Sequence, residues 1–152
     1  MAAGFATLFC YMETEEFFKG LKEIVNNWDN VVDTIIDSLL GDMVNMERDR
    51  LFTGVNADGT EINPPYTPFT VMVKSEKGQP TDRVTLFDTG AFYDSLFAER
   101  NGGEIIFDAT DEKRDKLVRK YGDVFGLSDT QIDILRESVN ERMSEYILSK
   151  LN

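Results

Sequence analysis

The hydrophobic pattern of the first third of the chain predicts one long helix from Glu13 to about Phe52. Apolar residues recur there at steps of three and four, which places them on one face of an α-helix: Phe17, Leu21, Ile24, Trp28, Val31 and Ile35. A second apolar row widens this face: Phe18, Val25, Val32, Ile36, Leu39 and Leu40. A narrow coiled-coil seam needs no second row, so we expect two packing partners. We expect a break at Gly41, because glycine inside a helix costs about 1 kcal/mol.

The segment from Val55 to Pro80 contains all four prolines of the chain and two Gly-containing turns. Proline lacks an amide donor and fixes φ, so neither a regular helix nor a central strand suits this composition. We therefore expect an extended Pro-rich loop over 55–80. A loop longer than about 12 residues is unusual in a compact domain unless it has a function. Its large apolar side chains predict that it packs on its own domain or on a neighbour: Tyr66, Phe69, Val71 and Met72.

The rest of the chain predicts a small antiparallel sheet and further helices. Two β-capable runs around Asn101-Gly102-Gly103 are typical of a hairpin over 96–108. Ser128 and Gln131 have the spacing of a capping box, which marks a helix start. The other expected elements are a strand at 83–87, a helical turn at 89–95 and helices at 111–121 and 128–150. The expected fold class is α+β, with a long N-terminal helix and a C-terminal helix packed on a small antiparallel sheet, and a long Pro-rich loop.

The length of 152 residues suits a single domain, which we place at 13–152. Residues 1–12 are apolar but lack the basic start of a signal peptide, so we expect an N-terminal arm that docks on a partner. No apolar run approaches the roughly 18 residues that a membrane span requires. We therefore expect no membrane contact.

The net charge of the chain bears on whether it binds nucleic acid. Its 16 basic and 28 acidic residues give a formal net charge of −12. Nucleic-acid binding usually requires a basic face, and the one basic cluster, at 113–120, is interrupted by Asp115. Acidic residues early and basic residues late complement a helix dipole. We interpret the cluster as an ordinary short helix and expect no direct sequence-specific nucleic-acid binding.

The histidine and cysteine content restricts the catalytic and metal-binding chemistry that the chain can perform. The chain contains no histidine, which excludes Ser-His and Cys-His catalysis and histidine-based metal sites. Cys10 is its only cysteine, so no intrachain disulfide can form. We expect no catalytic residue, no metal ligand and no bound cofactor, although lysine- or carboxylate-based chemistry stays open.

The sequence Leu86-Phe87-Asp88-Thr89-Gly90-Ala91 supports two interpretations. Asp-Thr-Gly-Ala after two apolar residues is the signature of aspartic proteases, whose paired carboxylates activate a water molecule. One such motif per chain would act only in a dimer, and that family needs an almost wholly β scaffold, which the helical pattern disfavours. The alternative is local: Asp88 or Thr89 caps a short helix whose Phe92 faces the core.

Five motifs follow one another between about Gly54 and Ser95: Asp58-Gly59, Pro64-Pro65-Tyr66, Lys74 with Lys77-Gly78, Leu86-Phe87-Asp88-Thr89-Gly90, and Asp94-Ser95-Leu96. In this order they resemble the pattern of tailed-bacteriophage tail-completion, head–tail joining and virion-morphogenesis proteins. Lys120-Tyr121-Gly122 and Phe125-Gly126-Leu127 are similar to the downstream part of such proteins. Family members often carry a Tyr-Ala-x-x-His-Gln-Phe-Gly segment, which this chain lacks, so the resemblance is to a divergent member.

The resemblance implies a non-enzymatic structural protein of the virion, a neck or tail-completion (head–tail connector) subunit. Its implied partners are copies of itself in a cyclic ring and neighbouring neck, portal-adaptor or tail proteins. Its implied location is the neck or tail region of the virion, and the host cytoplasm during assembly. We expect the contacts to lie in the arm and in the loop: Phe5, Leu8, Phe9, Tyr11, Pro64, Pro65, Tyr66 and Phe69.

Two other function classes stay open. One is a dimeric retropepsin-like aspartic protease that uses Asp88, and the other is a non-viral soluble adaptor domain. The protease depends on the Asp88 carboxylate, which a structural subunit does not need for assembly. Association of the chain with itself in a ring separates the virion protein from the adaptor.

Overall fold

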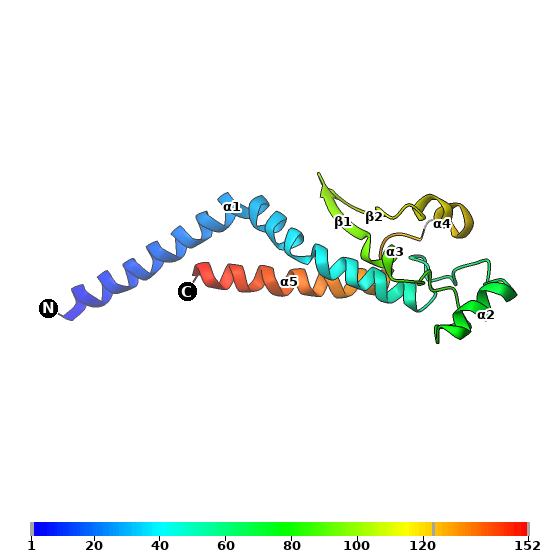
Figure 1. The fold of residues 1–152 in the computed structure, drawn as a ribbon. Coiled ribbons are helices and arrows are strands. Elements are labelled where there is room, and N and C mark those ends of the chain that lie inside the picture. Colours follow the sequence, from blue (N-terminus) through cyan, green and yellow to red (C-terminus); the bar gives the residue numbers. More distant parts are fainter. Residues whose placement is uncertain (1, 123, 152) are drawn as a thin grey trace. The chain divides into compact units, whose positions relative to one another are not determined.

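A computed structural model describes the backbone of residues 2–122 and 124–151, and the side chains of these ranges from residue 14 onward. Its elements in chain order (Figure 1) are α1 (Ala2–Phe52), α2 (Pro68–Glu76), α3 (Ala91–Asp94), β1 (Leu96–Asn101), β2 (Glu104–Ala109), α4 (Arg114–Tyr121) and α5 (Asp129–Leu151). This is the predicted α+β fold, with long helices near both ends of the chain and a two-stranded sheet. None of the described helices is both long and apolar enough to span a membrane.

The chain forms two compact units. Unit 1 comprises residues 1–38 and 136–152, and unit 2 comprises residues 39–135. Unit 1 contains only segments of α1 and α5, whereas unit 2 contains the remaining elements. The side chains of the predicted arm at 1–12 lie outside the described residues.

The helical segments of unit 1 approach each other closely at Gly20. A Cβ atom on Gly20 would lie 2.1 Å from the carbonyl oxygen of Lys150, so only glycine allows this approach of the two backbones. Two polar contacts join the same segments. The Lys150 ammonium lies 3.3 Å from the Glu23 carboxylate, and Arg142 Nη1 donates to Ser38 Oγ at 2.6 Å.

Each apolar row of α1 is buried only in part within unit 1. Ile24 and Ile35 of the first row are buried, as predicted, whereas Phe17 and Trp28 of the same row are exposed. Phe18 and Val25 of the second row are 60% and 73% exposed, so the described residues of this chain do not supply the second partner that the pattern predicts. The break expected at Gly41 was wrong, because α1 continues through it while its neighbours pack in the core of unit 2.

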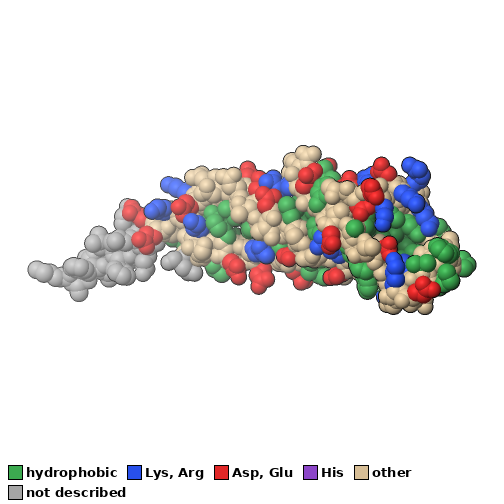
Figure 2. All heavy atoms as spheres, viewed as in Figure 1, with side chains coloured by type: hydrophobic (Ala, Val, Ile, Leu, Met, Phe, Trp, Pro, Cys, Tyr) green, Lys and Arg blue, Asp and Glu red, His purple; other side chains and the backbone are tan. Residues whose placement is uncertain are grey.

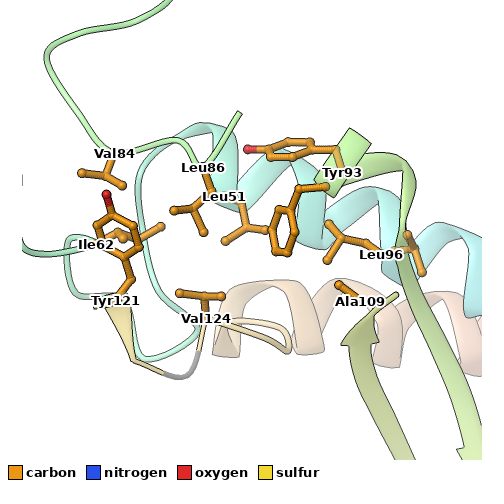
Figure 3. Packing of buried hydrophobic residues seen from close by; sticks show 11 residues of the cluster. Leu51, Ile62, Val84, Leu86, Tyr93, Leu96, Ala109, Tyr121 and Val124 are labelled. Atoms are coloured by element: carbon orange, nitrogen blue, oxygen red, sulfur yellow. The ribbon is translucent and has the colours of Figure 1, made fainter. Parts of the chain in front are cut away.

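The core of unit 2 is built around Leu51, which lies near the end of α1 and has no exposed surface. Figure 3 shows Leu51 among the other buried side chains of this core. The buried cluster unites the end of α1 with the 84–96 segment, the hairpin and the residues that close α4: Val44, Leu51, Ile62, Val84, Leu86, Phe92, Tyr93, Leu96, Ala109, Tyr121 and Val124. One core therefore fixes α3, α4 and the sheet relative to the end of α1.

The strand predicted at 83–87 does not form. Val84, Thr85 and Leu86 are buried, but Leu86 has a φ of 56°, which interrupts an extended backbone. The backbone of this segment forms hydrogen bonds with tyrosine hydroxyl groups instead of with a neighbouring strand. The Thr85 amide donates to the hydroxyl oxygen of Tyr66 at 2.9 Å, and the Tyr93 hydroxyl donates to the Thr85 carbonyl at 2.5 Å. The apolar pattern of this segment indicated burial correctly, and its side-chain partners could not be predicted from it.

The prediction of an extended loop over all of 55–80 was also wrong, because α2 occupies Pro68–Glu76. Thr67 caps this helix, since its Oγ1 accepts the Thr70 amide at 3.3 Å. Pro68 is in the first turn, where a helix needs no amide donor and where the φ of proline is already suitable. The Thr-Pro pair is thus a helix start, although proline is unsuited to a helix interior.

The predicted hairpin and capping box are confirmed. β1 and β2 pair antiparallel, from Leu96 opposite Ala109 to the turn after Asn101. The Ser128 amide donates to Gln131 Oε1 at 3.1 Å, and the Gln131 amide donates back to Ser128 Oγ at 3.4 Å. Of the two predicted capping residues of α3, Asp88 was wrong, because it binds Lys77. Gly90 is at the N-cap position, and the alternative residue, Thr89, accepts the Ala91 amide on its Oγ1 at 3.4 Å.

Glu47 and Arg50, one turn apart on α1, hold the backbone that follows α4. The Arg50 guanidinium donates to the carbonyl groups of Val55, Val124 and Gly126 at 2.6, 2.7 and 2.9 Å. Glu47 Oε1 accepts the Gly126 amide at 3.0 Å. Burial raises the pKa of the Glu47 carboxyl to about 7, although the Gly126 amide and the Arg50 charge act in the opposite direction. We call this group of contacts the Glu47–Arg50 clasp.

Gly20→Ala and Gly41→Ala form a matched pair that tests the close approach in unit 1. We predict that Gly20→Ala lowers the free energy of unfolding by about 1–3 kcal/mol, because the added methyl group overlaps a backbone oxygen. Nothing lies within 4 Å of a Cβ at Gly41, so Gly41→Ala should raise it by about 0.5–1 kcal/mol. Urea denaturation of both variants measures the difference, and equal effects of the same sign would contradict the packing described.

Glu47→Gln tests the clasp through its pH dependence. The pKa of Glu47 is about 7 in the folded chain against 4.5 for a free carboxyl group. Between these values the folded chain binds a proton that the unfolded chain has lost, so the free energy of unfolding falls as the pH rises, by about 3 kcal/mol in total. Glutamine keeps an acceptor for the Gly126 amide without the buried charge. We predict that the variant is the more stable protein at pH 8, and that this advantage shrinks toward pH 5 in urea denaturation. An advantage independent of pH would refute the assignment.

Candidate functional site

An open pocket of about 380 Å³ lies in unit 2, lined by residues of α2, the 86–93 segment and α4. Among the described residues, its lining contains five of the eight lysines of the chain together with a single carboxylate: Lys74, Lys77, Lys113, Lys116, Lys120 and Asp88. In a chain of net charge −12 this is a marked concentration of positive charge. Figure 2 shows basic side chains beside a hydrophobic area over α2 and α4. We call this site the lysine pocket.

Helix α4 provides one wall of the lysine pocket. Lys113, Lys116 and Lys120 follow each other at steps of three and four, so they lie on one face of the helix. All three side chains are exposed and line the pocket. The clasp positions this wall, since it holds the backbone that follows α4.

Lys74 of α2 contributes positive charge from a buried position, with 7% of its surface exposed. Its ammonium group donates to the Phe87 carbonyl and, at 3.0 Å, to Gln79 Oε1. It also lies 4.9 Å from the centre of the Tyr66 ring, a favourable cation–π distance. These acceptors are neutral, so they bind the ammonium group without cancelling its charge. Lys74 joins α2 to the 79–87 segment and makes the pocket more positive.

Lys77 and Asp88 form an exposed ion pair at the edge of the lysine pocket. Lys77 Nζ lies 2.5 Å from Asp88 Oδ1. This hydrogen bond and the lysine charge hold the pKa of Asp88 below its usual value, so the carboxyl group is ionised at neutral pH. Gln79 completes the contact by donating to the Asp88 carbonyl at 2.6 Å.

The pocket also has an apolar part. Phe69 of α2 is 70% exposed, and its neighbour along the helix surface, Met72, is 52% exposed. Phe69, Val73 and Leu117 line the pocket among the lysines. This combination of ammonium and apolar groups suits a ligand that carries carboxylates next to hydrophobic side chains.

The predicted contact residues of the 55–80 segment have different surroundings. Pro64 and Pro65 are exposed, and Phe69 lies in the lysine pocket. Tyr66 packs against the core of unit 2, and its hydroxyl group binds Thr85. The predicted contacts Phe5, Leu8, Phe9 and Tyr11 have side chains outside the described residues.

The lysine pocket itself was not predicted from the sequence. The basic cluster at 113–120 was interpreted as an ordinary short helix, and α4 is indeed a helix there. The spacing of its three lysines was a signal that they share one face. Nothing in the sequence indicated that Lys74 and Lys77 lie beside them, because the core that joins α2 to α4 links segments far apart in the chain.

Comparisons with protein families, with curated proteins and with solved structures give no match to this chain. Within the described residues there is also no group of three or more His, Cys, Asp or Glu side chains placed to hold a metal ion. The features of this chain that indicate a binding function are its lysine pocket and its exposed apolar surfaces.

Lys74→Met and Lys77→Met test whether the buried Lys74 stabilises the fold more than the exposed Lys77 does. We predict that Lys74→Met lowers the free energy of unfolding by about 1–3 kcal/mol, because the Phe87 carbonyl loses its donor in a buried site. Lys77→Met removes only an exposed ion pair, which contributes about 0–1 kcal/mol. Thermal or urea denaturation measures both effects. If Lys77→Met lowers the free energy of unfolding as much as Lys74→Met does, the roles assigned to the two lysines are incorrect.

Proposed function

We propose that this chain is a non-enzymatic structural subunit of a tailed-phage virion, in a neck or tail-completion ring. The order of motifs between Gly54 and Ser95 supports the virion role, through its resemblance to head–tail joining proteins. The observation that carries the assembly role is the exposed apolar surface on α1 and α2. A ring of identical subunits requires each copy to offer two different surfaces to its neighbours.

The exposed second row of α1 supports self-association. Phe18 and Val25 are two helical turns apart, so they lie on the same face of α1. Together with Phe17 and Trp28, which are also exposed, they form an apolar surface in unit 1. Complete burial of a side chain of this size contributes about 1.5–3 kcal/mol. Contact with another protein would remove these four side chains from water.

The surroundings of Asp88 favour the structural role over the protease. An aspartic protease holds two carboxylates together, one ionised and one protonated. In this chain the nearest charge to Asp88 is the ammonium group of Lys77, which keeps the carboxylate ionised. The scaffold differs as well, since the described residues form one two-stranded sheet among helices. Asp88 is one of the groups that line the lysine pocket.

The ring distinguishes the virion subunit from the adaptor domain. An adaptor binds other proteins without needing copies of itself, whereas a neck subunit is arranged around the axis of the tail. In this proposal the subunit binds its own copies first and then portal-adaptor, neck or tail proteins. Neither binding event requires a cofactor or a catalytic group.

Phe18→Ser with Val25→Ser tests whether the second row of α1 is an assembly surface. We predict that this double variant stays folded, because both side chains are exposed, and that it remains monomeric where the parent chain forms oligomers. Asn26→Ser with Asn30→Ser is the control, since it changes exposed polar positions of the same helix. Mass photometry measures the oligomeric state, and circular dichroism confirms the helix content.

Electron microscopy of phage lysates gives the second measurement. Where only the double variant is supplied, heads and tails should accumulate unjoined, whereas the control variant should support complete virions. Complete virions from the double variant would show that Phe18 and Val25 are not part of an assembly surface. Complete virions without any copy of the chain would refute the proposed function.

A further inference from the structure

We propose that the lysine pocket is the docking site for the acidic face of α5 on a second copy of this chain. The inference rests on the proposed function, because it names one contact between neighbouring subunits. It is independent of the apolar row of α1, which would make a separate contact.

The basic side of this contact is well defined. Lys113, Lys116 and Lys120 cover an arc of about 60° and span about 10 Å along α4, from the rise and turn of an α-helix. Lys74 adds its charge from the opposite wall, and Phe69 lies among the ammonium groups. A ligand for this site therefore needs carboxylates at similar intervals and an apolar group beside them.

The outer face of α5 in unit 1 has these properties. Glu137, Glu141 and Glu145 recur at every fourth residue, and all three are exposed. Leu148 lies on the same face and is 58% exposed. The four side chains cover an arc of about 80°, and the three carboxylates span about 12 Å along the helix. The spacing of the glutamates thus matches the spacing of the three lysines on α4.

The charge of the chain gives this contact a further role. Copies of a chain with net charge −12 repel each other unless a basic area meets an acidic one. The lysine pocket is such a basic area, and the face of α5 is an acidic area on a different surface. Contact between them is heterologous, from one surface of a copy to another surface of the next, as a ring requires.

A nucleic-acid ligand fits the same site less well. Phosphate backbones are bound by basic surfaces, whereas the pocket also contains the carboxylate of Asp88. The exposed Phe69 and the neighbouring Val73 also favour a partner with hydrophobic side chains. An acidic helix with a leucine on the same face fits both kinds of lining group.

Charge exchange between two variants of the full chain tests this contact. Variant A carries Lys113→Glu, Lys116→Glu and Lys120→Glu, and variant B carries Glu137→Lys, Glu141→Lys and Glu145→Lys. In either variant alone, the pocket and the α5 face have the same charge. In an equimolar mixture, each pocket of A meets an α5 face of B, and each pocket of B meets an α5 face of A, with opposite charges in both contacts.

We expect sedimentation velocity to show that A alone and B alone associate about tenfold or more weakly than the parent chain. The mixture should recover association that weakens with added salt. Arg119→Glu and Asn140→Lys are controls, because they change the charge in the same direction as A and B, respectively, at exposed positions off the two faces. If a triple variant unfolds, the single changes Lys116→Glu and Glu141→Lys replace it in the same design.

Three results would overturn the contact. The first is association of A and of B equal to that of the parent chain, which leaves self-assembly through the α1 row intact. The second is a mixture that associates no better than its components. The third is a parent chain that stays monomeric, or one that binds double-stranded DNA through the lysines lost in A. The lysate assay reports separately whether the chain still serves in virions, so failure of this contact and failure of the proposed function are distinguishable.

Discussion

Arg50 binds three backbone carbonyl groups from two separate segments, and the arrangement of unit 2 depends on this interaction. It connects the end of α1 to Val55 and to the residues that follow α4. Glu47 strengthens the connection through the Gly126 amide, at the cost of burying a carboxyl group whose pKa rises to about 7. Removing the partners of a buried charged group strongly destabilises the folded protein. The clasp therefore makes the position of α4 depend on the end of α1.

The position of α4 determines the lysine pocket. Of the five pocket lysines, Lys116 and Lys120 lie on α4 and Lys113 is its N-cap residue. Lys74 lies on α2 and Lys77 is its C-cap residue. Helix α2 is joined to the same core through Tyr66 and the 79–87 segment. The buried core thus creates a surface property, a concentration of positive charge on an acidic protein. The proposed contact with the acidic face of α5 uses this property, and the exposed row of α1 provides a second surface for assembly.

Elements with a local signal were predictable from the sequence, and elements that depend on distant partners were not. The hairpin has its Asn-Gly turn, α5 has its capping box at Ser128, and α1 has its periodic apolar rows. By contrast, the 83–87 segment has the composition of a strand, yet its backbone binds the hydroxyl groups of Tyr66 and Tyr93. The start of α2 at Pro68 is not evident from composition, because proline disfavours a helix interior yet suits a first helical turn. The lysine pocket required the whole core of unit 2 to bring its two walls together.

We propose that identical copies of this chain assemble into a ring through their own surfaces. Electron microscopy of the purified chain at increasing protein concentration shows whether such rings form. We expect closed rings of uniform diameter that dissociate as the salt concentration rises, because one of the two proposed contacts is electrostatic. Particles of monomer size at every concentration and at low salt would refute the proposed ring.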